Sequence, residues 1–143
     1  MPGDFLDSNV LLYLFSQEDA TKKAAVAVVG DALRQRSGQI SFQVVQEVLN
    51  GIFRLPAQPV SAEDARLFLR ETLVPLWTVD PSQTLYERAL VVHERYRYAF
   101  YDALIIAAAL ESGCTRLLSE DFQDGQRIEG VTIENPFRGL PAR

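Results

Sequence analysis

Residues 4–13 read DFLDSNVLLY, and this stretch decides the fold. The apolar pair Phe5 and Leu6 leads to the acid Asp7, and Ser8 and Asn9, which are typical of helix starts, precede an apolar run. The stretch predicts a first strand that ends at Asp7 and a helix that begins at Ser8 or Asn9. An acid at the carboxyl end of a strand in an open α/β sheet points into the crevice where such folds bind ligands. Taken alone, Asp7 is more simply explained as a helix cap, so the positions of other acids decide its role.

Helices and strands alternate along the rest of the chain. We expect helices over residues 10–15, 20–36, 42–54, 61–71, 81–96 and 102–111, and strands over residues 39–41, 74–79, 116–119 and 130–134. Asp80 is expected to cap one helix with Pro81 at its first position, and Ser37-Gly38 to end another. Polar loops are expected over residues 55–60 and 120–126. Because strands that alternate with helices pair in parallel, we predict a three-layer α/β/α sandwich around a mostly parallel sheet of four or five strands.

Apolar residues mark the expected core. Residues 103–110 are apolar without interruption, which predicts that the helix over residues 102–111 is central and buried. Trp77 and its apolar neighbours, Leu73, Val74, Leu76 and Val79, are also expected in the core. No linker interrupts residues 1–143, so we expect a single domain.

Composition and charge restrict the class of function. Hydrophobic residues make up 48% of the chain and charged residues 23%, which is typical of a soluble globular protein. We find no apolar run of membrane-spanning length and no secretory signal. Cys114 is the one cysteine, which excludes an intrachain disulfide and a cysteine-based zinc site and favours a cytoplasmic location. The net charge of −5 argues against binding of nucleic acid by bulk charge, but not against an enzyme whose acidic pocket is neutralised by cations.

Three further acids lie at places that match the place of Asp7. Glu47 is early in the helix after the second strand, Asp102 begins the most apolar helix, and Asp121 follows the strand over residues 116–119. Each has a simpler explanation: Glu47 lies off the apolar face of its helix, Asp102 is a cap, and Asp121 belongs to a polar loop. In a parallel sheet, however, all four positions share one edge. Carboxylates that converge there repel one another unless hard divalent cations such as Mg²⁺ or Mn²⁺ neutralise them.

The motifs around these acids resemble those of PIN-domain ribonucleases, and most closely those of the toxins of VapBC-type toxin–antitoxin modules. The resemblance covers nearly the whole chain and rests on residues 5–11, 45–49, 101–105 and 117–121, which read FLDSNVL, VQEVL, YDALI and LLSED. It implies that Asp7, Glu47, Asp102 and Asp121 are the catalytic, metal-binding acids. It also implies that Ser8, Asn9 and Ser119 support them through hydrogen bonds. Glu120 and Asp124 stay open as alternatives to Asp121 as the fourth acid.

The resemblance implies a metal-dependent endoribonuclease, the toxin of a type II toxin–antitoxin pair. One or two Mg²⁺ or Mn²⁺ ions per site would activate water, which attacks a phosphodiester bond of RNA and leaves a 5′-phosphate and a 3′-hydroxyl. The expected partners are RNA, a cognate antitoxin protein and a second copy of the chain in a homodimer. DNA would be contacted only through the antitoxin, and no membrane is involved. The alternative is a catalytically weak PIN-fold module that binds RNA or regulates.

Three residues at the end of one helix are candidates for RNA contact. Arg95, Tyr96 and Arg97 mix cations with an aromatic ring, which suits backbone contact and base stacking, although cations at a helix end also suit the helix dipole. His93, the one histidine, is expected at the surface. A set of four apolar residues could line an antitoxin surface, although a core role is favoured for most of them: Phe53, Leu67, Phe68 and Leu69.

Overall fold

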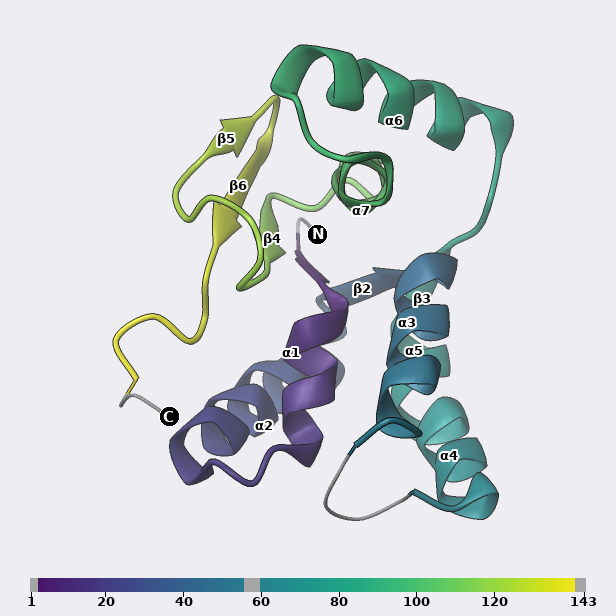
Figure 1. Cartoon of the computed structure of the whole chain (residues 1–143), viewed down its shortest axis with the longest axis vertical. Coiled ribbons are helices and arrows are strands. Elements are labelled where there is room, and N and C mark those ends of the chain that lie inside the picture. The colour runs from purple at the N-terminus through teal and green to yellow at the C-terminus, as the bar shows by residue number, and fades with distance from the viewer. Residues whose placement is uncertain (1–2, 56–59, 141–143) are drawn as a thin grey trace.

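The structure, a computed structural model, describes residues 3–55 and 60–140 (Figure 1). The loop expected over residues 55–60 lies outside the described residues except at its two ends. Within the described ranges, no helix is both long enough and apolar enough to cross a membrane.

The described residues contain a six-stranded sheet with the strand order β3-β2-β1-β4-β6-β5. Its strands are β1 (Asp4–Leu6), β2 (Gly38–Ser41), β3 (Trp77–Val79), β4 (Arg116–Leu118), β5 (Arg127–Ile128) and β6 (Val131–Glu134). Strands β3, β2, β1, β4 and β6 pair in parallel, as predicted, and β5 runs antiparallel to β6. The prediction of four or five strands missed β5. A strand of two residues is too short to leave a periodic pattern in the sequence.

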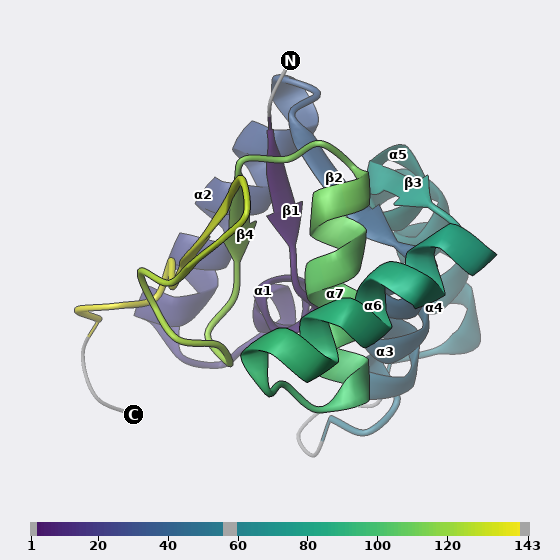
Figure 2. The same cartoon turned by 90° about the horizontal axis from the view of Figure 1, so that it is seen from above.

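Helices cover both faces of this sheet. They are α1 (Ser8–Leu12), η1 (Tyr13–Phe15), α2 (Asp19–Arg34), α3 (Phe42–Ile52), α4 (Ala62–Phe68), η2 (Leu69–Leu73), α5 (Val74–Leu76), α6 (Gln83–Tyr96) and α7 (Phe100–Glu111). Figure 2 shows α2 on one side of β1 and β4, and α7 and α6 on the other side. Helix α7 packs directly on β2 and β4, and α6 packs on α7. The predicted three-layer α/β/α sandwich is therefore confirmed.

One part of the core lies between the central strands and α7. Residues 103–109 of α7 are all buried, which confirms that the most apolar helix is central. They contact a layer in which Phe5, Leu6 and Leu117 come from the two middle strands. Fully burying side chains of this size stabilises the fold by roughly 1.5–3 kcal/mol each. Because the middle strands are held this firmly, the residues that follow β1 and β4 start from well-defined positions.

The prediction of a strand over residues 74–79 is wrong for residues 74–76, which are helical. The chain stays helical from Ala62 through η2 and α5 to Leu76, and β3 contains Trp77–Val79 alone. Leu73 and Leu76, three residues apart, are buried, which is the helical period. Val74 and Trp77 are 49% and 39% exposed, so their predicted core role is also wrong. Trp77 lies on an edge strand, where one side of the ladder has no neighbouring strand.

Several predicted helix boundaries also differ. Helix α6 is capped by Ser82, whose Oγ accepts the N–H of Leu85 at 3.0 Å, and not by Asp80. Helix α2 ends at Arg34, and Gly38 belongs to β2. Helix α7 begins at Phe100, so Asp102 lies inside its first turn. Caps depend on hydrogen bonds formed in the folded chain, and two candidates only two residues apart cannot be separated by residue type alone.

Candidate functional site

Asp7 lies where β1 turns into α1. Its backbone N–H donates to the carbonyl of Leu118 at 3.0 Å, which continues the pairing of β1 with β4 by one residue. Its backbone is extended, with φ −75° and ψ 162°, and its Oδ1 accepts the N–H of Ser8 at 2.7 Å, so Asp7 does cap α1. The side chain is 3% exposed. A cap needs one of its oxygens, and the second oxygen faces the end of β4.

Two polar side chains surround the second oxygen of Asp7. Ser119 donates its hydroxyl to Asp7 Oδ2 at 2.7 Å. The Nδ2 of Asn9 lies 3.2 Å from Ser119 Oγ, 3.1 Å from Asp121 Oδ2 and 3.4 Å from Asp7 Oδ2. The N–H of Asp121 donates to Ser119 Oγ at 3.1 Å. The ends of β1 and β4 are therefore joined by one network of hydrogen bonds that includes two of the predicted acids.

The contacts of the neighbouring acids favour Asp121 over its two alternatives. Asp124 accepts the N–H of Asn135 at 2.8 Å and pairs with Arg138 at 2.5 Å, so it holds the C-terminal segment. Glu120 accepts the hydroxyl of Tyr13. Asp121 is the acid that shares a donor with Asp7. It is also exposed and can turn toward a ligand.

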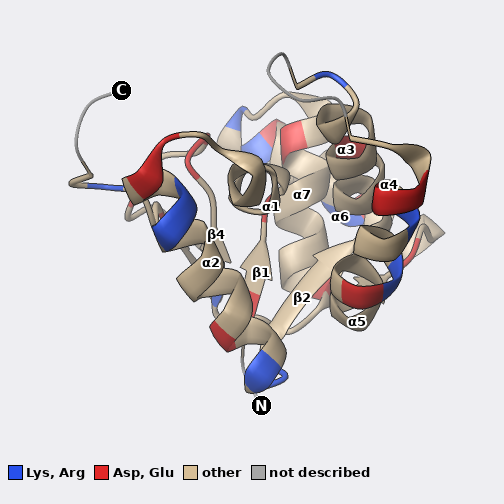
Figure 3. Ribbon diagram, turned by 90° about the horizontal axis from the view of Figure 1, so that it is seen from below, with Lys and Arg blue, Asp and Glu red and all other residues tan. Residues whose placement is uncertain are grey.

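All four predicted acids lie in one electrostatic field. The pKa of Asp7 is raised to about 6, chiefly by burial and to a smaller extent by the charges of Glu47 and Asp121, against the lowering effect of the bonds from Ser119 and Ser8. Burial, followed by the charge of Asp121, also raises the pKa of Asp102. Figure 3 shows acidic positions around the region enclosed by α1, α3 and α7. The structure thus brings Asp7 and Asp121 into contact through Asn9, and places Glu47 and Asp102 near enough to act on them.

The chemistry of this donor set suits a hard divalent cation, because every candidate ligand is a carboxylate oxygen. Over the residues that the structure describes, however, no three His, Cys, Asp or Glu side chains are gathered closely enough to hold a metal ion. Asp7 is fixed by its bonds, whereas Asp102 and Asp121 are exposed. Binding an ion would therefore require the exposed carboxylates to move toward Asp7.

Gln43 is a residue of this site that the sequence analysis did not single out. It is 4% exposed, and its Nε2 donates at 3.1 Å both to Glu47 Oε2 and to the carbonyl of Tyr101. The periodicity of α3 placed Glu47 toward solvent, yet Glu47 is half-buried. Hydrophobic periodicity identifies the apolar face of a helix, but it does not identify a second, polar face that contacts another element. The signal that could have found Gln43 is its spacing of four residues from Glu47.

The candidate RNA-contact residues end α6 and lie beside the loop that carries Asp121. The ring of Tyr98 packs edge-on against Phe122 at 5.4 Å, and its hydroxyl donates to Gln126. Arg95 and Arg97 are exposed, whereas Tyr96 is half-buried against the core. His93 is exposed, as expected, with Nδ1 2.6 Å from the carbonyl of Tyr98.

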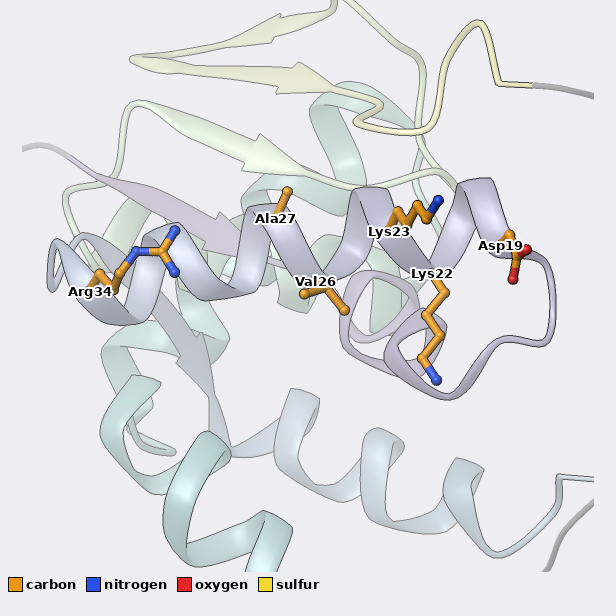
Figure 4. A pocket seen from close by; sticks show the side chains of 6 residues that line it. All are labelled: Asp19, Lys22, Lys23, Val26, Ala27 and Arg34. Carbon is orange, nitrogen blue, oxygen red and sulfur yellow. The ribbon is translucent and has the colours of Figure 1, made fainter.

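A separate pocket of about 440 Å³ lies along α2 (Figure 4). Both lysines of the chain line it, and none of the four acids does. Its lining residues are Asp19, Lys22, Lys23, Val26, Ala27 and Arg34.

Several solved structures with the same fold are toxins or toxin–antitoxin complexes. A toxin–antitoxin complex from Klebsiella pneumoniae superposes with a TM-score of 0.65 at 23% identity, covering 94% of this chain and 98% of that one. A DNA-bound VapBC complex from Salmonella typhimurium gives 0.62 at 19% identity, with 95% and 99% covered. A VapC toxin of Mycobacterium tuberculosis that cleaves the sarcin–ricin loop gives 0.59 at 20% identity, with 83% and 92% covered. At these identities the likeness shows the fold alone.

The sequence itself shows the family. No curated protein matches it at a significant level. The model of the PIN domain, by contrast, matches residues 5–126, a range that includes Asp7, Glu47, Asp102 and Asp121. Because this match spans most of the sequence, the chain belongs to the PIN domain family.

Proposed function

We propose that this protein is a Mg²⁺- or Mn²⁺-dependent endoribonuclease and the toxin of a toxin–antitoxin pair. The observation that carries the proposal is Asp7: a carboxylate 3% exposed, with a pKa near 6, in the field of Glu47 and Asp121. A buried carboxylate whose pKa is raised by neighbouring carboxylates is expected at a site that binds a cation. The toxin of Mycobacterium tuberculosis with the same fold, which cleaves the sarcin–ricin loop, supports RNA as the substrate.

Asp7, Glu47, Asp102 and Asp121 would hold the cation, one or two ions per site. Bound there, it would polarise a phosphodiester and lower the pKa of water. Ser119 and Asn9 keep the Asp7 carboxylate in one orientation through the bonds already described. The contact of Ser8 with Asp7 runs through its backbone N–H.

The surface beside the acids suits an RNA strand. Arg95 and Arg97 would contact phosphates, and Tyr101, which is 69% exposed and precedes Asp102, offers a ring on which a base can stack. Tyr96 contributes less, because its ring packs partly against the core.

The proposed partners are an antitoxin protein and a second copy of the chain, with DNA bound only through the antitoxin. The complexes from Klebsiella pneumoniae and Salmonella typhimurium support an antitoxin. Phe53 and Leu67 are 53% and 47% exposed, so they offer apolar surface to a partner, whereas Phe68 and Leu69 are half-buried.

The proposal is tested by incubating the purified protein with structured RNA in Mn²⁺, in Mg²⁺ and in EDTA. We expect cleavage with either metal, loss of cleavage in EDTA, and a loss of at least about 100-fold in Asp7→Asn. Asp80→Asn, an exposed aspartate outside the site, is the matched control and should cleave like the wild type. Cleavage that persists in EDTA or in Asp7→Asn would contradict the proposal.

The second candidate is a module of the same fold that binds RNA without cutting it. The absence of a tight acidic cluster among the described residues favours it. The same experiment separates the two candidates, because RNA binding without cleavage under any metal condition supports the module.

A further inference from the structure

One buried amide connects Glu47 to the turn of α7 that carries Asp102. Gln43 lies in the first turn of α3, four residues before Glu47, and its Nε2 donates to Glu47 Oε2 at 3.1 Å. The same Nε2 donates at 3.1 Å to the carbonyl of Tyr101, the residue before Asp102. Gln43 therefore bridges α3 and α7, which lie next to each other in Figure 3, at the point where each carries an acid.

The amide can face these partners in one orientation alone. A carboxylate oxygen and a carbonyl oxygen both accept hydrogen bonds, so the NH₂ group of Gln43 must point toward them. Its Oε1 is then buried, and it has no hydrogen-bond partner among the described residues. A buried carbonyl oxygen without a partner lowers stability. For packing alone, an apolar side chain of the same size would serve better, and what it cannot supply is the two donors.

Both donors act on the position of an acid. Glu47 is half-buried with three rotatable side-chain bonds, and the bond from Gln43 restricts it to conformations that place Oε2 beside the amide. The bond to the Tyr101 carbonyl ties the first turn of α7 to α3. The side chain of Asp102 is exposed, so the backbone of that turn is what sets its starting position.

We propose that Gln43 is a positioning residue, which holds Glu47 and the first turn of α7 so that Glu47 and Asp102 can bind one divalent cation together. This inference rests on the proposed function. Partners that orient metal ligands without touching the metal typically change metal affinity by 10–100-fold when they are removed.

Mn²⁺ binding by the purified full chain, measured by isothermal titration calorimetry, tests the proposal without a cleavage assay. In Gln43→Met, which keeps the length of the side chain and removes both donors, we expect affinity to fall by about 10-fold. The melting temperature without metal should not fall below that of the wild type by more than a few degrees, because the unpaired oxygen is removed as well. Gln46→Met, an exposed position on the same helix, is the control and should bind like the wild type.

A second variant keeps the test decisive if Gln43→Met loses stability. In a Glu47→Gln background, Gln43→Met should lower Mn²⁺ affinity by much less than it does in the wild type, because Gln43 acts partly through Glu47. A general folding defect would lower affinity equally in both backgrounds. Equal losses, or wild-type affinity in Gln43→Met, would overturn the role of Gln43. A wild type that binds no Mn²⁺ and cleaves no RNA overturns the proposed function, and the cation site falls with it.

Discussion

At the scale of the residue, Asp7 combines the role of a helix cap with the proposed role of a metal ligand. Its Oδ1 caps α1 and its Oδ2 accepts from Ser119. A carboxylate has lone pairs enough for both. The cap accounts for the position of one oxygen, and the second oxygen is buried against the hydroxyl of Ser119. Burial without a compensating cation is costly for the ionised form, and the pKa near 6 expresses that cost.

The raised pKa of Asp7 predicts how stability depends on pH in the metal-free protein. Because the folded-state pKa of about 6 exceeds the ordinary value of 3.8, folded Asp7 keeps its proton to a higher pH than unfolded Asp7. The group therefore contributes stability that is fully present below pH 3.8 and is lost as the pH rises through 6. The gap of about two pKa units corresponds to about 3 kcal/mol.

Urea unfolding between pH 4 and pH 8 in EDTA measures this loss. We expect the wild type to lose stability over the range, and Asp7→Asn, which cannot ionise, to be more stable than the wild type by about 1–3 kcal/mol at pH 8. Asp80→Asn should follow the wild-type curve. Equal stabilities of Asp7→Asn and the wild type at pH 8 would show that burial does not act on Asp7 as inferred.

At the scale of the element, two helices end in residues with left-handed backbone. Arg97, which ends α6, has φ 66°, and Arg36, which follows α2, has φ 52°. A side chain in this region costs about 1 kcal/mol relative to glycine. A strained arginine at the end of α6, beside the loop of Asp121, is consistent with a role in RNA contact, whereas Arg36 lies at the other edge of the molecule near β2.

These two positions form a matched pair. Arg97→Gly and Arg36→Gly should each raise the free energy of unfolding by up to about 1 kcal/mol, because each relieves a left-handed backbone. RNA binding should weaken several-fold in Arg97→Gly and stay unchanged in Arg36→Gly. Thermal unfolding and filter binding to a labelled RNA check the two effects separately. If both variants bind RNA like the wild type, Arg97 has no part in the interface.

At the scale of the whole molecule, the sheet decides where the acids meet. Arg116 donates to Asp4 at 2.6 and 2.7 Å and to Glu134 at 2.9 Å, so it links the N-terminal ends of β1 and β4 to the last residue of β6. The hydrogen bonds that Arg116 donates to Asp4 are the largest cause of its raised pKa. Asp4 is thus an ion-pair partner at the edge of the sheet away from the site, whereas Asp7 and Asp121 follow the opposite ends of β1 and β4.

The proposed toxin activity predicts an effect on the whole cell. Induced expression in a bacterial host should arrest growth, and co-expression of the cognate antitoxin should restore it. Cells that express Asp102→Asn, which lacks one proposed metal ligand, should grow normally. An immunoblot checks that the variant and the wild type are present at the same level. Equal growth arrest by the wild type and Asp102→Asn would count against the toxin proposal.

Much of this protein follows from residue order alone. Apolar residues at positions 5–6, 40 and 117–118 predicted parallel strands. The uninterrupted apolar run of α7 predicted a buried helix. The acids after β1 and β4 were located from the ends of the predicted strands. Hydrophobic periodicity is local, and parallel pairing follows from alternation, so neither needs knowledge of distant contacts.

The tertiary structure decided what depends on neighbours distant in the sequence. Trp77 looked like core, yet its strand lies at the edge of the sheet. Asp121, and not Asp124, shares a donor with Asp7 because Asp124 is engaged by Asn135 and Arg138. Glu47 is half-buried because Gln43 and the start of α7 cover that face of α3. Burial and hydrogen bonding are properties of the packed chain, and a residue's own helix or strand cannot determine what a second element brings against it.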